Sequence, residues 1–189
     1  MDINQLMNTM LSKDTVKGLG KLTGTSQKGV RGVLSSALPS MLNGAKAQAD
    51  DTSTAAGFVK ALSDHAKDDT ADISSFISGI DLNDGGKIVS HLLGSAAKET
   101  ARTAAEEAGV KETKANNILS AAAPLMMSLI GQQVSSGSNA SSNNSSGISS
   151  LMGSLLSNAD MTSLITSAIG GSSGSGGLLS SILGIFGKK

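Results

Sequence analysis

Apolar residues recur at intervals of three and four through most of residues 1–131, the spacing that gathers them on one face of an α-helix. The first such stripe follows Asp2, a residue suited to cap a helix N-terminus, and consists of Ile3, Leu6, Met7, Met10 and Leu11. No stretch alternates apolar and polar residues with the period of two that a half-buried strand needs. The pattern predicts an all-α domain over residues 1–131.

Helix boundaries are expected at residues with capping chemistry. Asp14 is a candidate cap for the second helix, and Gly24 can end that helix in a left-handed conformation. Thr25 or Ser26 can cap the third helix. Pro39 lies inside the apolar stripe of that helix, and because proline removes a backbone donor and clashes with the preceding turn, a kink or break is expected near residues 37–38.

The later helices have similar signals. Asn43-Gly44 could end the third stripe, and a helix containing Phe58 is expected to follow. Asp84 and Ser95 are the expected caps of two further helices, the second of which should end at Gly109. A last long helix is then predicted from about residue 112 to residue 131.

One segment of the chain occurs twice in similar form, as an internal sequence repeat. Residues 24–42 recur at residues 109–127 with an offset of 85 and no gap, and the only two prolines, Pro39 and Pro124, occupy the same place in both copies. The pairing extends backwards to Ile3 and Ile88. We therefore expect an internal duplication of a three-helix unit, with copies at residues 3–44 and 88–129 that stack on each other to cover their apolar faces.

The composition changes beyond this domain. Residues 132–147 form a Gly/Ser/Asn-rich stretch expected to act as a flexible linker, and residues 148–189 add three short apolar segments. An apolar stripe on a tether must find a surface to cover it, and contact with protein, either self-association or a partner, is favoured over membrane contact. The candidate contact residues lie in residues 177–189: Leu178, Leu179, Ile182, Leu183 and Phe186.

A family resemblance rests on four motifs: TGTS, LSSALPSML, NDGGKIVSHLLG and ILSAAAPLMM. Together they resemble an uncharacterised bacterial domain-of-unknown-function family in the YidB-like superfamily, over roughly residues 10–131. The resemblance implies an all-helical bacterial protein, and it implies no catalytic residues.

Composition limits the chemistry available to the chain. Fifteen basic and fifteen acidic residues cancel, so no global field steers the protein to nucleic acid or an anionic membrane. Cysteine, tryptophan and tyrosine are absent, which removes thiolate chemistry and most aromatic stacking. The N-terminus lacks the pattern of a signal peptide and no run of about 20 apolar residues occurs, so a cytoplasmic location is expected by default.

The candidate polar clusters fit ordinary surface roles better than catalysis. His65 stands among Asp64, Asp68 and Asp69, but the spacing matches no established metal-ligand pattern. Residues 81–92 fail as a calcium loop because Leu92 stands where a bidentate Glu is required. We therefore expect no enzyme activity, no cofactor and no metal.

A helix-turn-helix-like element at residues 16–34 provides the alternative function. A glycine turn joins two apolar-patterned helices, and four basic residues near it could contact phosphates: Lys17, Lys21, Lys28 and Arg31. The second copy has Glu106, Glu107 and Glu112 in its place, which is unfavourable for DNA. The favoured interpretation is a non-enzymatic structural or interaction protein that assembles, as a homo-oligomer or with a protein partner, through its apolar tail; DNA binding is the alternative.

Overall fold

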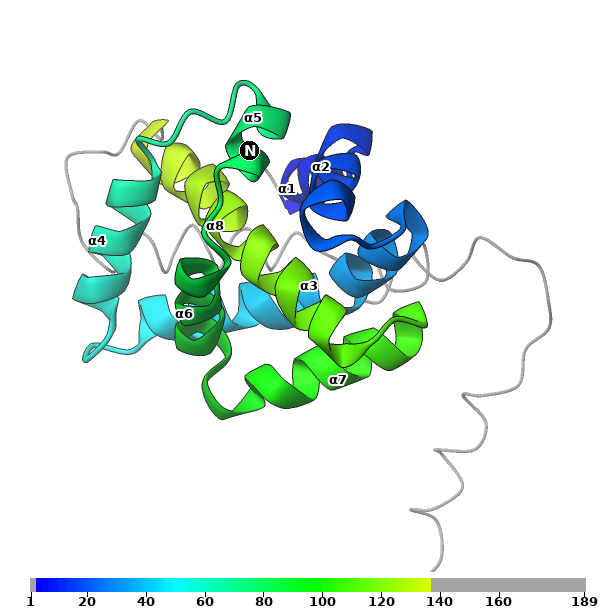
Figure 1. The fold of residues 1–189 in the computed structure, drawn as a ribbon. Helices are drawn as coiled ribbons and strands as arrows, with labels where there is room; N and C mark the ends of the chain where they lie inside the picture. The colour runs from blue at the N-terminus through cyan, green and yellow to red at the C-terminus, as the bar shows by residue number, and fades with distance from the viewer. Residues whose placement is uncertain (1–2, 137–189) are drawn as a thin grey trace, which may run out of the picture. The chain divides into compact units, whose positions relative to one another are not determined.

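The computed structural model describes residues 3–136, which form helices and no strand (Figure 1). The predicted all-α class is confirmed for this part of the chain. The helices, in order, are α1 Ile3–Met10, α2 Lys13–Thr23, α3 Gln27–Asp50, α4 Ala55–His65, α5 Ile73–Ser78, α6 Leu82–Leu93, the 3-10 helix η1 Gly94–Ala96, α7 Ala97–Ala108 and α8 Glu112–Ser136.

Two long helices form the centre of the domain. In Figure 1, α8 crosses the front and α3 passes behind it, with α4 and α6 on one side and α1 and α2 on the other. α7 packs along α3, α4 and α6 pack against α8, and α5 packs on α2. Leu, Met and Ala fill most of the core, and within residues 5–135 no buried side chain is larger than Phe58, so the helices approach one another closely.

Proline does not break either long helix. α3 runs without interruption from Gln27 to Asp50 and contains Pro39, and α8 contains Pro124 in the same way. A break at residues 37–38 is therefore ruled out. The third apolar stripe does not end at Asn43-Gly44 as expected, because Ala45 and Ala49 further along α3 are also buried. The physical reason is tertiary: residues on both sides of Pro39 are fully or nearly fully buried, and their burial outweighs the loss of one backbone hydrogen bond.

Some expected helix ends are confirmed. Gly24 (φ 62°, ψ 40°) and Gly109 (φ 64°, ψ 36°) close α2 and α7 in the left-handed conformation that glycine adopts without strain. Ser26 caps α3, because its hydroxyl accepts a hydrogen bond from the Gly29 amide at 3.2 Å.

Other expected caps are wrong by one to three residues. α2 begins at Lys13 and is capped by Ser12, whose Oγ accepts from the Thr15 amide at 3.2 Å, so Asp14 lies in the first turn. Asp81, not Asp84, caps α6 by accepting from the Asn83 amide at 2.8 Å. Ser95 lies inside η1 and does not cap α7. In each case the N-cap is the residue immediately before the first helical residue, and tertiary packing decides at which residue the helix begins.

The helix bounds follow the sequence repeat in part. Shifted by 85, α2 covers residues 98–108 and α3 covers residues 112–135, within one residue of the bounds of α7 and α8. The shift fails for the first helix, because α1 would cover residues 88–95 whereas α6 begins at Leu82. The superposition of the two three-helix units stays a prediction.

α8 is long and apolar enough to cross a membrane by length and composition, with a mean hydropathy of 1.2 over its apolar window. It is the one helix of this kind among the described residues, and 72% of that window is buried inside the domain. Its apolar surface is therefore already covered by the helices packed around it.

Candidate functional site

The short helix α5 lies between two hollows in the surface of the described domain. Asp72 starts the helix, because its carboxylate accepts from the Ser75 amide at 3.1 Å. This backbone hydrogen bond lowers the pKa of Asp72, since it stabilises the charged carboxylate. Ile77 is 1% exposed and anchors α5 to the domain, which leaves the opposite face of the helix in solvent.

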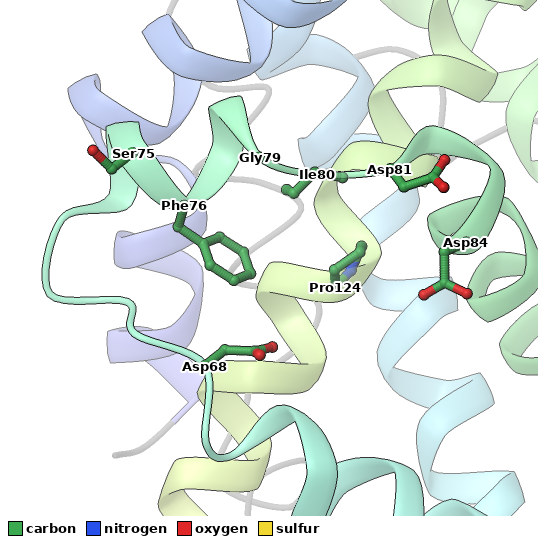
Figure 2. A pocket seen from close by; sticks show the side chains of 8 residues that line it. All are labelled: Asp68, Ser75, Phe76, Gly79, Ile80, Asp81, Asp84 and Pro124. Carbon is green, nitrogen blue, oxygen red and sulfur yellow. The ribbon is translucent and has the colours of Figure 1, made fainter.

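The first hollow, which we call the acidic hollow, has a volume of about 350 Å³ (Figure 2). Phe76 points into it from α5, and Ile80 and Pro124 add apolar surface. Its polar lining carries three carboxylates and no basic side chain. The complete lining is Asp68, Ser75, Phe76, Gly79, Ile80, Asp81, Asp84 and Pro124.

Each of the three carboxylates has a partner within the chain. Asp81 caps α6, and Asp84 Oδ1 lies 3.7 Å from Lys87 Nζ. Asp68 Oδ2 accepts from Ser128 Oγ at 2.7 Å and lies 2.9 Å from His65 Nδ1. Among residues 3–136 no three His, Cys, Asp or Glu side chains come together in a way that could hold a metal ion.

The Ser128, Asp68 and His65 side chains resemble a hydrolytic triad in composition but not in connectivity. A nucleophilic serine must give its proton to a histidine, which a carboxylate then orients. Here the carboxylate stands in the middle, so the serine hydroxyl meets Asp68 and not the imidazole. Ser128 is also 0% exposed, so this arrangement cannot present an activated hydroxyl to a substrate.

The network instead ties the loop between α4 and α5 to α8. Gln132 Nε2 donates to the Asp68 carbonyl at 2.8 Å, and Thr70 Oγ1 donates to Gln132 Oε1 at 3.1 Å. These contacts join residues about 60 positions apart in sequence, so local spacing could not reveal them. The available signal was Ser128 itself, a polar residue within the apolar run of α8.

The second hollow, which we call the basic hollow, lies between α2 and α5 and has a volume of about 500 Å³. Lys17 and Lys21 line it from successive turns of α2, and both are exposed. Neither lysine forms an ion pair with the described part of the chain. The complete lining is Asp14, Lys17, Gly18, Lys21, Leu22, Ser74, Ser75, Ile77 and Ser78.

The other two candidate nucleic-acid residues have different surroundings. Lys28 is exposed near the start of α3. Arg31 Nη1 donates to the Leu11 carbonyl at 2.9 Å, so its guanidinium closes the C-terminal end of α1. The structure therefore brings Lys17 and Lys21 together in one hollow and places Arg31 in a structural role.

The neutral net charge conceals a strong asymmetry along the described chain. Residues 3–48 contain six basic and one acidic residue, a balance of +5, whereas residues 49–136 contain seven basic and twelve acidic residues, a balance of −5. The sum over the whole chain hides this division. The five tail residues proposed for self-association or membrane contact lie outside the described residues.

These features define an all-helical domain, and its helices span the region matched by one family model. That model, described as "Bacterial protein of unknown function (DUF937)", matches residues 5–133, and the chain belongs to this family. The family resemblance noted from the sequence is confirmed to this extent, while the YidB-like superfamily remains a prediction. No curated protein and no solved structure matches the chain at a significant level.

Proposed function

We propose that this protein is a non-enzymatic structural or interaction protein that assembles with copies of itself, or attaches to a partner, through the apolar segment at residues 177–189. The observation that favours a binding role over catalysis is the set of partners that the carboxylates of the acidic hollow have within the chain. Its carboxylates are used in a helix cap, an ion pair and a tertiary hydrogen-bond network. No buried side-chain polar atom among the described residues lacks a hydrogen-bond partner, so no buried polar group there is left to bind a substrate.

The chemistry of residues 177–189 supports the assembling role of the tail. Within this segment, helical spacing is followed by Leu178, Leu179, Ile182, Leu183 and Phe186, and the residues between them are Ser, Gly and Ile185. Burying one such side chain contributes about 1.5–3 kcal/mol, and ordering the backbone costs about 1–2 kcal/mol per residue. The two terms are comparable, so the segment gains a net advantage only when it docks on another surface. A cytoplasmic location is part of this proposal.

The test uses the full chain with two apolar tail residues replaced, Leu183→Asp and Phe186→Asp. A matched control, Ser180→Asp and Ser181→Asp, adds the same two charges to the polar positions of the same segment. In sedimentation velocity, the wild type and the control should form assemblies that persist in high salt, whereas the apolar replacement should be reduced to smaller species. Equal sedimentation of all three proteins overturns the assembling role.

A liposome flotation experiment on the same three proteins separates the two surfaces that the tail could cover. If the tail attaches to a membrane, the wild type and the control should float with the liposomes, whereas the Leu183→Asp, Phe186→Asp variant should not. This result, together with no self-association of the wild type, would assign the tail to membrane attachment and not to protein assembly.

DNA binding is a second candidate, favoured by the exposed lysines of the positively charged N-terminal half. Lys17→Glu with Lys28→Glu should abolish a salt-sensitive DNA shift if these side chains contact phosphates. Arg31 is left unchanged, because its replacement would open the end of α1. A DNA shift that is unaffected by the double change, or no shift at low salt, rules out this candidate.

A further inference from the structure

The outer face of α5 is built from small polar residues that stand between surfaces of opposite charge. The exposed residues, which we call the α5 ridge, are Ser74, Ser75, Ser78 and Gly79. The basic hollow adjoins this ridge on the α2 side, where Lys17 and Lys21 project without partners in the described chain. The acidic hollow adjoins it on the α6 side, where Asp81 and Asp84 lie (Figure 2).

The two hollows occupy opposite flanks of the same helix. With about 100° between successive helical residues, Phe76 and Gly79 face one flank, and Ser74 and Ser78 face the other. Ser75 lies between them at the crest and is the one α5 residue that lines both hollows. Asp14 also lines the basic hollow, where the two lysines outnumber it, and Lys87 lies 3.7 Å from Asp84 on the other flank, where the carboxylates outnumber it. The surface therefore carries a net positive flank, a small-residue crest and a net negative flank side by side.

We infer that the α5 ridge is a two-fold interface between two copies of this chain, with the lysines of each copy facing Asp81 and Asp84 of the other. A two-fold axis that runs along α5 in the plane of the interface exchanges the two flanks. Each basic flank then meets an acidic flank, and both contacts form at once, as an isologous interface requires. A surface with one charge on both flanks could not pair with itself in this way.

The ridge suits such a contact sterically. Serine and glycine have short side chains, so two α5 helices can approach closely while the longer Lys and Asp side chains meet across the flanks. Phe76 is half-buried in the acidic hollow and offers limited apolar area. Charge pairing therefore dominates the interface, so its strength should fall with added salt, unlike that of an apolar tail contact.

The interface is separate from the tail and can be tested independently in the full-length Leu183→Asp, Phe186→Asp background. One variant reverses the basic flank, with Lys17→Glu and Lys21→Glu. A second reverses the acidic flank, with Asp84→Lys and Asp81→Asn, where Asn keeps the cap of α6. The matched control for the basic-flank variant, Lys98→Glu with Lys111→Glu, makes the same change in net charge as that variant at exposed positions outside both hollows.

Sedimentation equilibrium at about 0.05 M salt, where exposed charges are weakly screened, should give a dimer for the background protein and for the control. Each flank variant alone should dimerise at least about tenfold more weakly, because like charges face each other at both contacts. A 1:1 mixture of the two flank variants should restore the dimer, since one copy is then acidic on both flanks and the other basic.

Several outcomes would overturn the interface. These are a monomeric background protein at low salt, flank variants that dimerise like the control, or a mixture that stays monomeric although both variants keep the circular dichroism of the wild type. Loss of DNA binding in the basic-flank variant, without any change in self-association, would assign the lysines to nucleic acid instead. None of these outcomes depends on the tail, so failure of the interface and failure of the proposed tail function are distinguishable.

Discussion

The crossing of α6 over α8 rests on Gly85, and replacing this residue by alanine is the most direct test of the fold. A Cβ atom at position 85 would lie 1.8 Å from the carbonyl oxygen of Ser120. Carbon and carbonyl oxygen normally come no closer than about 3.3 Å, so α6 would have to retreat from α8 by more than an ångström. Neither group can turn aside, because both belong to the backbones of packed helices.

The expected cost follows from two opposing terms. Overpacking of a tight contact destabilises by about 1–3 kcal/mol, and the upper end applies here because no flexible side chain can yield. Alanine has a helix propensity better than that of glycine by about 1 kcal/mol. We therefore expect Gly85→Ala to lower the free energy of unfolding by about 2 kcal/mol.

Gly86→Ala is the matched control in the adjacent position. Its Cβ would meet Ser120 Oγ at 3.5 Å, an ordinary contact, so the propensity term should act alone and stabilise by up to about 1 kcal/mol. A difference of about 3 kcal/mol between the two variants corresponds to roughly 6–12 °C in Tm for a chain of this size.

Urea and thermal unfolding followed by far-UV circular dichroism will measure this difference, because the chain has no Trp or Tyr for fluorescence. If Gly85→Ala is as stable as Gly86→Ala, α6 does not cross α8 at Gly85, and the packing described for these helices is refuted.

Three further predictions concern caps and the polar network. Ser12→Ala should cost about 1 kcal/mol of unfolding free energy, and Asp14→Ala should cost clearly less in the same urea titration, since Ser12 is the cap of α2; the reverse order would restore Asp14 as the cap. The hydrogen bond that lowers the pKa of Asp72 stabilises the fold above the ordinary carboxyl pKa of 3.8, and this contribution is lost as pH falls below that value toward the lowered folded-state pKa. The unfolding midpoint should therefore drop less between neutral and acidic pH in Asp72→Ala than in the wild type, and an equal drop would exclude this role. Ser128→Ala should cost about 1–3 kcal/mol, because a buried hydroxyl bonded to the Asp68 carboxylate is removed, and a neutral effect on thermal unfolding would show that the link to α8 carries no stability.

Local pattern determined the helical class and several helix ends. Apolar residues at helical spacing specify an all-α domain whatever the surroundings. Gly24 and Gly109 end their helices because a left-handed C-cap is a property of the residue and its neighbours, and Ser26 caps α3 for a similarly local reason.

Other boundaries depended on packing. Pro39 and Asn43-Gly44 are local signals for a break, yet α3 continues to Asp50 because buried residues on both sides of Pro39 hold it in place. Ser12 and Asp81 are the caps rather than Asp14 and Asp84, since tertiary contacts decide at which residue a helix starts. The cost inside a helix is about 3 kcal/mol for a proline and about 1 kcal/mol for a glycine, and the burial of several apolar side chains, at about 1.5–3 kcal/mol each, exceeds it.

The charged surface around α5 could not be predicted from the local sequence pattern. Its basic flank comes from α2, its acidic flank from α6 and the preceding loop, and its crest from a six-residue helix. Charged residues and their sum of zero can be read from the amino-acid sequence. Their placement on opposite sides of one ridge follows from the packing of the helices, because the distance between two charges in space does not depend on their separation along the chain.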